Sequence, residues 1–125
     1  MTSSSSSSYF ENWTTQVRKG ILELYILNAL KDDECYGYDL VRKLMEMPGV
    51  GMREGTIYPL LSRLRTQGLV ATRLVESSSG PARKYYRLTD DGQAALEMMS
   101  RHWDLLCNNL NAMSQHGEGG DDGPA

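Results

Sequence analysis

Apolar residues recur at intervals of three or four along three stretches of the first half of the chain, which predicts three helices. The first covers residues 14–31 and has apolar residues around most of its surface, so we expect it to be central and mostly buried. The second covers residues 36–47 and stops before Pro48. The third covers residues 55–67 and ends at Gly68, a typical left-handed cap.

The pattern changes to alternation after the third helix, which predicts a β-hairpin. Residues 69–75 are rich in β-branched side chains, residues 77–81 are turn-forming, and residues 83–88 alternate again. This alternation predicts that Tyr86 and Leu88 face the core. Three helices followed by a hairpin are the elements of a winged helix-turn-helix.

A fourth helix follows from Thr89, with acidic residues in its first turn that complement the helix dipole. Its large apolar residues form an unbroken heptad seam, a stripe typical of helices that pair with another helix. Part of the seam could instead pack on the first helix of the same chain. Because so long a stripe would otherwise be exposed, we also predict self-association into a symmetric homodimer. The seam consists of Leu96, Met99, Trp103, Leu106, Leu110 and Met113.

The fold class is therefore mainly α with a small β-hairpin, a winged helix-turn-helix with a C-terminal dimerisation helix. Residues 1–11, rich in serine, are expected to be a disordered tail. Residues 12–88 form the winged helix and residues 89–114 the dimerisation helix. Residues 115–125, rich in glycine and acids, are expected to be a second disordered tail.

The composition is typical of a single soluble domain. The chain has 125 residues, and no apolar run approaches the roughly 20 residues that span a bilayer. No signal pattern is visible at its start, so we expect a cytoplasmic protein. Two cysteines are too few for a disulfide framework, and we expect both thiols to be reduced.

The distribution of charge matters more than its total. A formal net charge of −3 argues against a nucleic-acid partner when taken by itself. Residues 53–87, however, contain seven basic and two acidic residues, a net charge of +5 over the third helix and the hairpin. A basic surface on a nearly neutral body is typical of a protein that binds a phosphate backbone.

The outward side of the third helix carries groups that can donate to phosphates and contact base edges in a major groove. Two alternatives stay open: a plain solvated helix with Arg63 paired to an acid, and a mobile turn in place of a DNA-contacting hairpin. The candidate DNA-binding residues are Thr56, Tyr58, Pro59, Ser62, Arg63 and Thr66 on the helix, and Arg83 and Lys84 on the hairpin.

Four motifs in the same order resemble the PadR family of bacterial transcriptional regulators. They are KGILEL at 19–24, YGYDL at 36–40, GTIYPLLSRL at 55–64 and GPARKYYRLT at 80–89. The resemblance extends over about residues 17–113, and the single terminal helix is similar to that of the compact subfamily with one dimerising helix.

The resemblance implies a homodimeric DNA-binding regulator, usually a repressor. By analogy, Tyr58, Pro59, Ser62 and Arg63 enter the major groove. Arg83 and Lys84 meet the flanking groove or its phosphates. Two copies would bind an inverted repeat with half-sites about one helical turn apart.

Trp103 has two interpretations. Multidrug-sensing proteins that resemble this chain stack planar drugs on a tryptophan of the terminal helix, which implies a small planar or phenolic effector at Trp103 and Met99. A tryptophan on a seam more often simply fills the interface. Tyr36 and Tyr38 are better explained by packing, with Gly37 allowing a close approach of the helix.

Nothing in the sequence indicates catalysis, a cofactor or a metal. His102 and His116 are the only histidines, and Cys35 and Cys107 have neither metal-ligand spacing nor a neighbouring base. The chain is therefore not predicted to be an enzyme. The serious alternative is a winged helix that binds another protein through the same surface without DNA.

Overall fold

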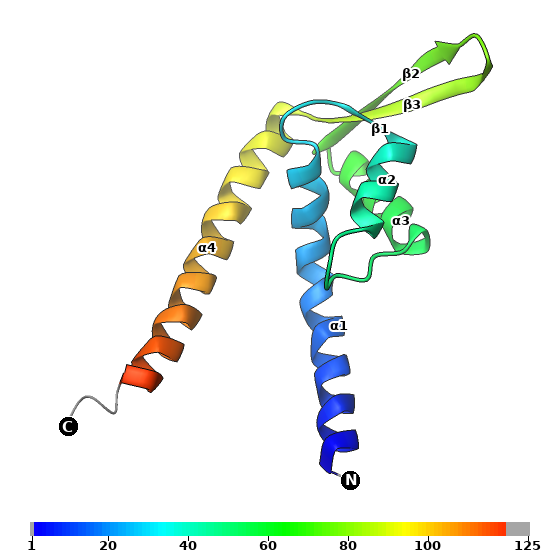
Figure 1. Cartoon of the computed structure of the whole chain (residues 1–125). Helices are drawn as coiled ribbons and strands as arrows, with labels where there is room; N and C mark the ends of the chain where they lie inside the picture. The colour runs from blue at the N-terminus through cyan, green and yellow to red at the C-terminus, as the bar shows by residue number, and fades with distance from the viewer. Residues whose placement is uncertain (1, 120–125) are drawn as a thin grey trace.

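The computed structural model describes residues 2–119 and consists of two long helices, two shorter helices and a small sheet (Figure 1). Figure 1 shows α1 between α4 on one side and α2 and α3 on the other. The long helices approach each other near the sheet and diverge toward the two chain ends. The elements are α1 (Thr2–Ala29), β1 (Cys35–Tyr36), α2 (Gly37–Met45), α3 (Glu54–Thr66), β2 (Val70–Ser77), β3 (Gly80–Leu88) and α4 (Asp90–Gly119).

The core lies where the second half of α1 meets α2, α3 and the base of the sheet. Its most buried members are apolar residues on one side of each helix, together with Val70 of β2, and they are almost inaccessible because each helix buries one apolar stripe. In α1 the buried stripe includes Leu22 and Ile26, and residues 14–21 of this helix are not buried, in contrast to the expectation. The most buried side chains are Ile26, Leu27, Leu30, Leu40, Leu44, Ile57, Leu61 and Val70.

The sheet has three strands in the order β1-β3-β2, all antiparallel, and not the two predicted. The additional strand β1 pairs Cys35 with Tyr86 and Tyr36 with Tyr85. Tyr36 was expected to begin the second helix, but it is extended and α2 begins at Gly37. A strand of two residues is too short to show alternation, so it forms only through its partner.

Gly37 lets α2 approach the sheet closely, as predicted. A Cβ atom at Gly37 would lie 2.9 Å from Cε1 of Tyr86 and 3.4 Å from the carbonyl oxygen of Lys84. The ring of Tyr86 is buried against this position, and burial raises the pKa of its hydroxyl. Gly37 therefore has a packing role at the junction of α2 and β3.

The end of α3 confirms the left-handed cap. Gly68 has a φ of 79°, and the amide of Leu69 donates to the carbonyl oxygen of Leu64 at 3.0 Å. The amide of Gly68 donates to the carbonyl oxygen of Arg65, also at 3.0 Å. These two bonds form a Schellman motif, which turns the chain from the helix into β2.

Both chain ends differ from the prediction. Helix α1 begins at Thr2, so residues 2–11, expected to be disordered, are helical. Serine has an intermediate helix propensity, and extending a helix that is already formed adds one hydrogen bond per residue. Helix α4 continues to Gly119 and not to residue 114, and residues 120–125 of the predicted tail lie outside the described residues.

Candidate nucleic-acid interface

The outer face of α3 carries every candidate residue that the sequence assigned to this helix. Ile57, Leu61 and Leu64 hold the helix on the core, so the opposite side faces solvent. The side chains exposed there are Thr56, Tyr58, Pro59, Ser62, Arg63 and Thr66. This row offers hydroxyls, an aromatic ring and a guanidinium, which can contact base edges and phosphates.

Arg63 lies at the edge of this face and forms an ion pair with Glu23 of α1. Its Nη2 atom lies 3.2 Å from Oε2 of Glu23, and the Arg63 side chain is still 64% exposed. The structure therefore contains the ion pair between Arg63 and an acid that one of the two alternatives for this surface included. Because a guanidinium has five N–H donors, the pair leaves others free for a ligand.

Arg65 is a candidate that the sequence analysis did not assign to the site. It is exposed on the other flank of α3, and its positive charge and the neighbouring Tyr58 act in opposite directions on the pKa of Tyr86. Both side chains are exposed and lie near enough to Tyr86 of β3 to influence it. Arg65 is one of the seven basic residues counted in residues 53–87, and this positive charge is the sequence feature that could have assigned Arg65 to the interface.

Strands β2 and β3 form the wing, which projects from the body of the domain (Figure 1). Both predicted wing bases are exposed on it. They are successive residues of β3 and so point to opposite faces of the hairpin. The guanidinium of Arg83 lies over the ring of Tyr36, 4.9 Å from its centroid. Lys84 pairs across the strands with Leu74. The two bases thus cannot act as one cluster.

Arg73 of β2 is occupied by an acid. Its Nε atom donates to Oε2 of Glu34 at 2.8 Å, a second bond joins its Nη2 to Oε1, and its guanidinium lies over the ring of Tyr85. These bonds hold the pKa of the Glu34 carboxyl below its ordinary value. The pair connects the base of the wing to the loop before β1. Because Glu34 neutralises it, Arg73 does not add to the unpaired positive charge of the interface.

The heptad seam of α4 is divided between two environments. Leu96 is buried in the core and Met99 packs half-buried against it, so the start of the seam covers its own domain. Trp103 and Leu106 are 37% and 39% exposed. Leu110 is 64% exposed and Met113 is 70% exposed. The start of the seam thus packs on its own domain, as one of the two interpretations expects, and the exposure of the seam rises toward its end.

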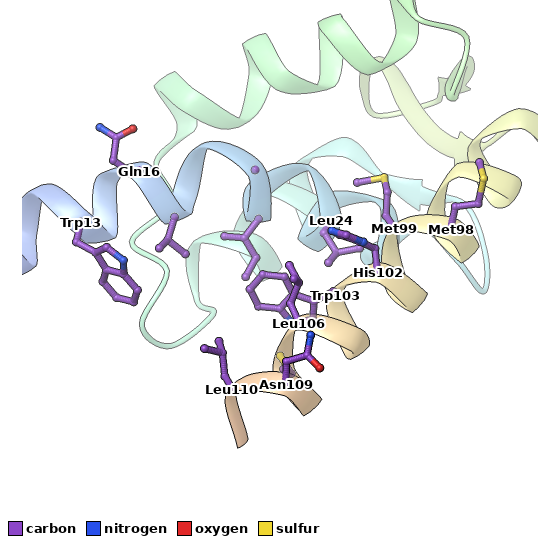
Figure 2. Close-up of a pocket in the computed structure, with 14 residues that line it drawn as sticks. Trp13, Gln16, Leu24, Met98, Met99, His102, Trp103, Leu106, Asn109 and Leu110 are labelled. Atoms are coloured by element: carbon purple, nitrogen blue, oxygen red, sulfur yellow. The ribbon is translucent and has the colours of Figure 1, made fainter. Parts of the chain in front are cut away.

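Where α1 and α4 diverge they enclose an apolar groove of about 830 Å³ (Figure 2). Trp103 and Leu106 extend from α4 into the space between the helices, and Trp13 lies on the α1 side. Val17 and Ile21 complete the α1 wall. Met99 borders this groove and also a smaller depression beside Arg63.

Within residues 2–119 no group of three or more potential metal ligands occurs, and Cys35 and Cys107 are free thiols. No helix in this part of the chain has the length and hydropathy needed to cross a membrane.

Residues 26–98 match the transcriptional regulator PadR-like family. The chain belongs to this family. PadR-family proteins are transcriptional regulators that bind DNA, and this chain is a regulator of that kind and not an enzyme. The winged helix-turn-helix of the prediction is confirmed, with the additional strand β1.

Individual proteins similar to this chain are also transcriptional regulators. The transcriptional regulator Rv3488 of Mycobacterium tuberculosis is 32% identical over 106 residues, which cover 83% of this chain and 95% of that protein. A PadR-like transcriptional regulator from Bacillus cereus is 40% identical, with a TM-score of 0.71 over 80% of this chain and 97% of that one. The negative transcriptional regulator PadR of Bacillus subtilis is 31% identical over 85 residues, covering 66% of this chain and 47% of that protein.

Proposed function

We propose that this PadR-family protein is a homodimeric repressor that acts in the cytoplasm on an inverted-repeat operator. The observation that carries the proposal is the outer face of α3, where Tyr58, Pro59, Ser62 and Thr66 are exposed together. A helix with such a face fits the major groove, in which hydroxyls and the proline ring contact base edges and thymine methyl groups.

The wing supports the same surface from its side. Lys84 is exposed and forms no ion pair among the described residues, so it is available to a phosphate. Arg83 is also exposed, and its stacking on Tyr36 holds it along the outer face of the hairpin. We assign both bases to the DNA backbone that flanks the site of α3.

The homodimer is supported by the exposed half of the seam. Leu110 and Met113 are mostly exposed in a single copy, and with the partly covered Trp103 and Leu106 they form an apolar stripe that a second copy of the chain would cover. A two-fold axis between the two copies would present one α3 helix to each half-site of an inverted repeat.

Repression by occupation of a promoter is supported by the relative named a negative transcriptional regulator. Release by an effector is supported by the groove between α1 and α4. Trp103 offers a flat ring and Met99 an adaptable side chain, which suit a planar or phenolic molecule. Because Met99 also borders the depression beside Arg63, an occupant could displace α3 relative to α1.

The experiment that tests this function is footprinting of the purified protein on its own promoter, followed by anisotropy titrations against the protected duplex and a scrambled one. We expect protection of an inverted repeat and preference for the protected duplex. Affinity should fall by orders of magnitude from low to moderate salt. Equal binding to both duplexes would contradict the proposal. Weak salt dependence with capture of a protein partner would favour the alternative, a winged helix that binds protein.

A further inference from the structure

Glu23 is a mostly covered carboxylate on α1, and its partner is an arginine of α3. Its side chain is only 20% exposed, and its Oε2 atom lies 3.2 Å from Nη2 of Arg63. The pair joins positions 40 residues apart in the sequence, and among the described residues it is the one ion pair between α1 and α3. Neither residue belongs to the apolar core that holds these helices together.

The position of Arg63 on α3 gives this pair a role in DNA contact. Ser62 and Thr66 occupy the middle of the exposed face, whereas Arg63 lies at its edge beside α1. A guanidinium at an edge can point along the helix, toward solvent or across the face. The contact with Glu23 selects one of these directions and leaves the remaining N–H donors of the planar group for a base or phosphate.

The burial of Glu23 determines whether the pair persists on DNA. If Arg63 left the pair, a carboxylate already largely removed from water would lose its counter-charge, which is costly. Arg63 can instead keep this bond and offer its outer N–H groups to the operator. Retention of the pair is therefore favoured over release.

We propose that Glu23 is a positioning residue for operator recognition: it holds the Arg63 guanidinium in the orientation that contacts a base edge, without touching DNA itself. This inference rests on the proposed function. It predicts that Glu23 contributes to discrimination between sequences and not to general affinity. Removing its negative charge should slightly strengthen binding to any DNA, while a freely rotating Arg63 should distinguish bases less well.

The test uses the full-length protein and its footprinted promoter. The measured quantity is the ratio of affinities for the operator and for a set of operators with single base-pair substitutions. Glu23→Gln keeps the shape of the side chain, and Glu23→Ala removes it. We expect both variants to lower this ratio about tenfold at the base pair that Arg63 contacts. Affinity for a scrambled duplex should be unchanged or slightly higher.

Two variants serve as controls. Glu46→Gln also removes one acid from an ion pair, because Oε2 of Glu46 lies 4.0 Å from Nη2 of Arg42 on α2, and both side chains are exposed. This variant should retain the wild-type ratio. In an Arg63→Ala background, Glu23→Gln should have no further effect on the ratio, since the group that Glu23 positions is gone.

The outcomes separate this inference from the proposed function. If the wild-type protein does not distinguish its promoter from scrambled DNA, the proposed function fails. If it does, and Glu23→Gln has an unchanged ratio, the positioning role alone is wrong. If Glu23→Gln binds the operator more tightly and keeps the wild-type ratio, Glu23 competes with DNA for Arg63. If Glu23→Gln lowers the ratio further in the Arg63→Ala background, its effect is purely structural. Either result overturns the inference.

Discussion

The backbone of Gly92, in the first turn of α4, lies directly against the carbonyl group of Leu69. A Cβ atom at Gly92 would lie 1.9 Å from the Leu69 oxygen. The Thr89 hydroxyl completes this junction, since it accepts a bond of 3.0 Å from the Gly92 amide and donates one of 2.6 Å to the carbonyl oxygen of Gly68. The predicted start of the fourth helix at Thr89 is thus confirmed, and this cap fastens α4 to the end of α3.

We expect Gly92→Ala to destabilise the protein strongly, because the new methyl group overlaps a backbone oxygen that has no rotamer to change. A loss of about 3 kcal/mol in the free energy of unfolding is consistent with overpacking of this kind. Urea denaturation followed by circular dichroism measures it. Gly55→Ala is the control, since a Cβ atom there meets nothing within 4 Å, and its stability should be unchanged or raised by up to about 1 kcal/mol.

Arg63→Ala and Lys84→Ala should weaken DNA binding in different ways. Loss of Arg63 should cost about 1–3 kcal/mol on the operator and reduce discrimination at one base pair, because a base contact disappears. Loss of Lys84 should weaken all duplexes about equally and reduce the salt dependence by about one phosphate contact. Anisotropy titrations at several salt concentrations separate the two. Wild-type binding by both variants would refute the assignment of the interface.

Leu110→Glu should convert the homodimer to monomers, because it places a charge in the apolar stripe that a second copy is proposed to cover. Sedimentation velocity measures the change. Leu105→Glu is the matched control: Leu105 is also an exposed leucine of α4 but does not border the groove, so this variant should remain dimeric. A monomeric wild-type protein at micromolar concentration would contradict the proposed homodimer.

Planar cations or flavins should quench the fluorescence of Trp103 if it serves as an effector platform. A Trp13→Phe background isolates the signal, because Trp13 and Trp103 are the two tryptophans of the chain. The reciprocal variant, Trp103→Phe, reports Trp13 on the opposite wall of the groove. Insensitivity of Trp103 across a broad panel of ligands would leave it with a packing role only.

The Glu34–Arg73 pair should contribute stability that disappears in acid. The pair lowers the pKa of Glu34 in the folded protein, so its contribution is fully present above the pKa of the unfolded chain and is lost as pH falls through the lower, folded value. The stability difference between the wild type and Glu34→Gln should therefore be largest near neutrality and shrink below about pH 4.5, the ordinary value for this carboxyl. Chemical denaturation at a series of pH values tests this. A constant difference would refute it.

Much of the candidate interface could be predicted from the sequence because its signals are local. The spacing of Ile57, Leu61 and Leu64 determines which side of α3 is buried, and hence that Tyr58 and Ser62 are exposed. An ion pair of Arg63 was one of the predicted alternatives, but the acid that forms it could not be predicted, since many acids are compatible with its charge. Only the crossing of α1 and α3 selects Glu23.

The sequence by itself determined the order of the four helices and the hairpin, the inward side of α3 and the caps at Gly68 and Thr89. These features depend on hydrogen bonds and burial among residues that are close in the chain. The tertiary structure alone decided that β1 joins the sheet, that the α4 seam divides after Met99, and that Glu23 lies against Arg63. Each of these features depends on how separate elements pack against one another. The contacts join residues that are far apart in the chain, and no periodic pattern in the sequence indicates them.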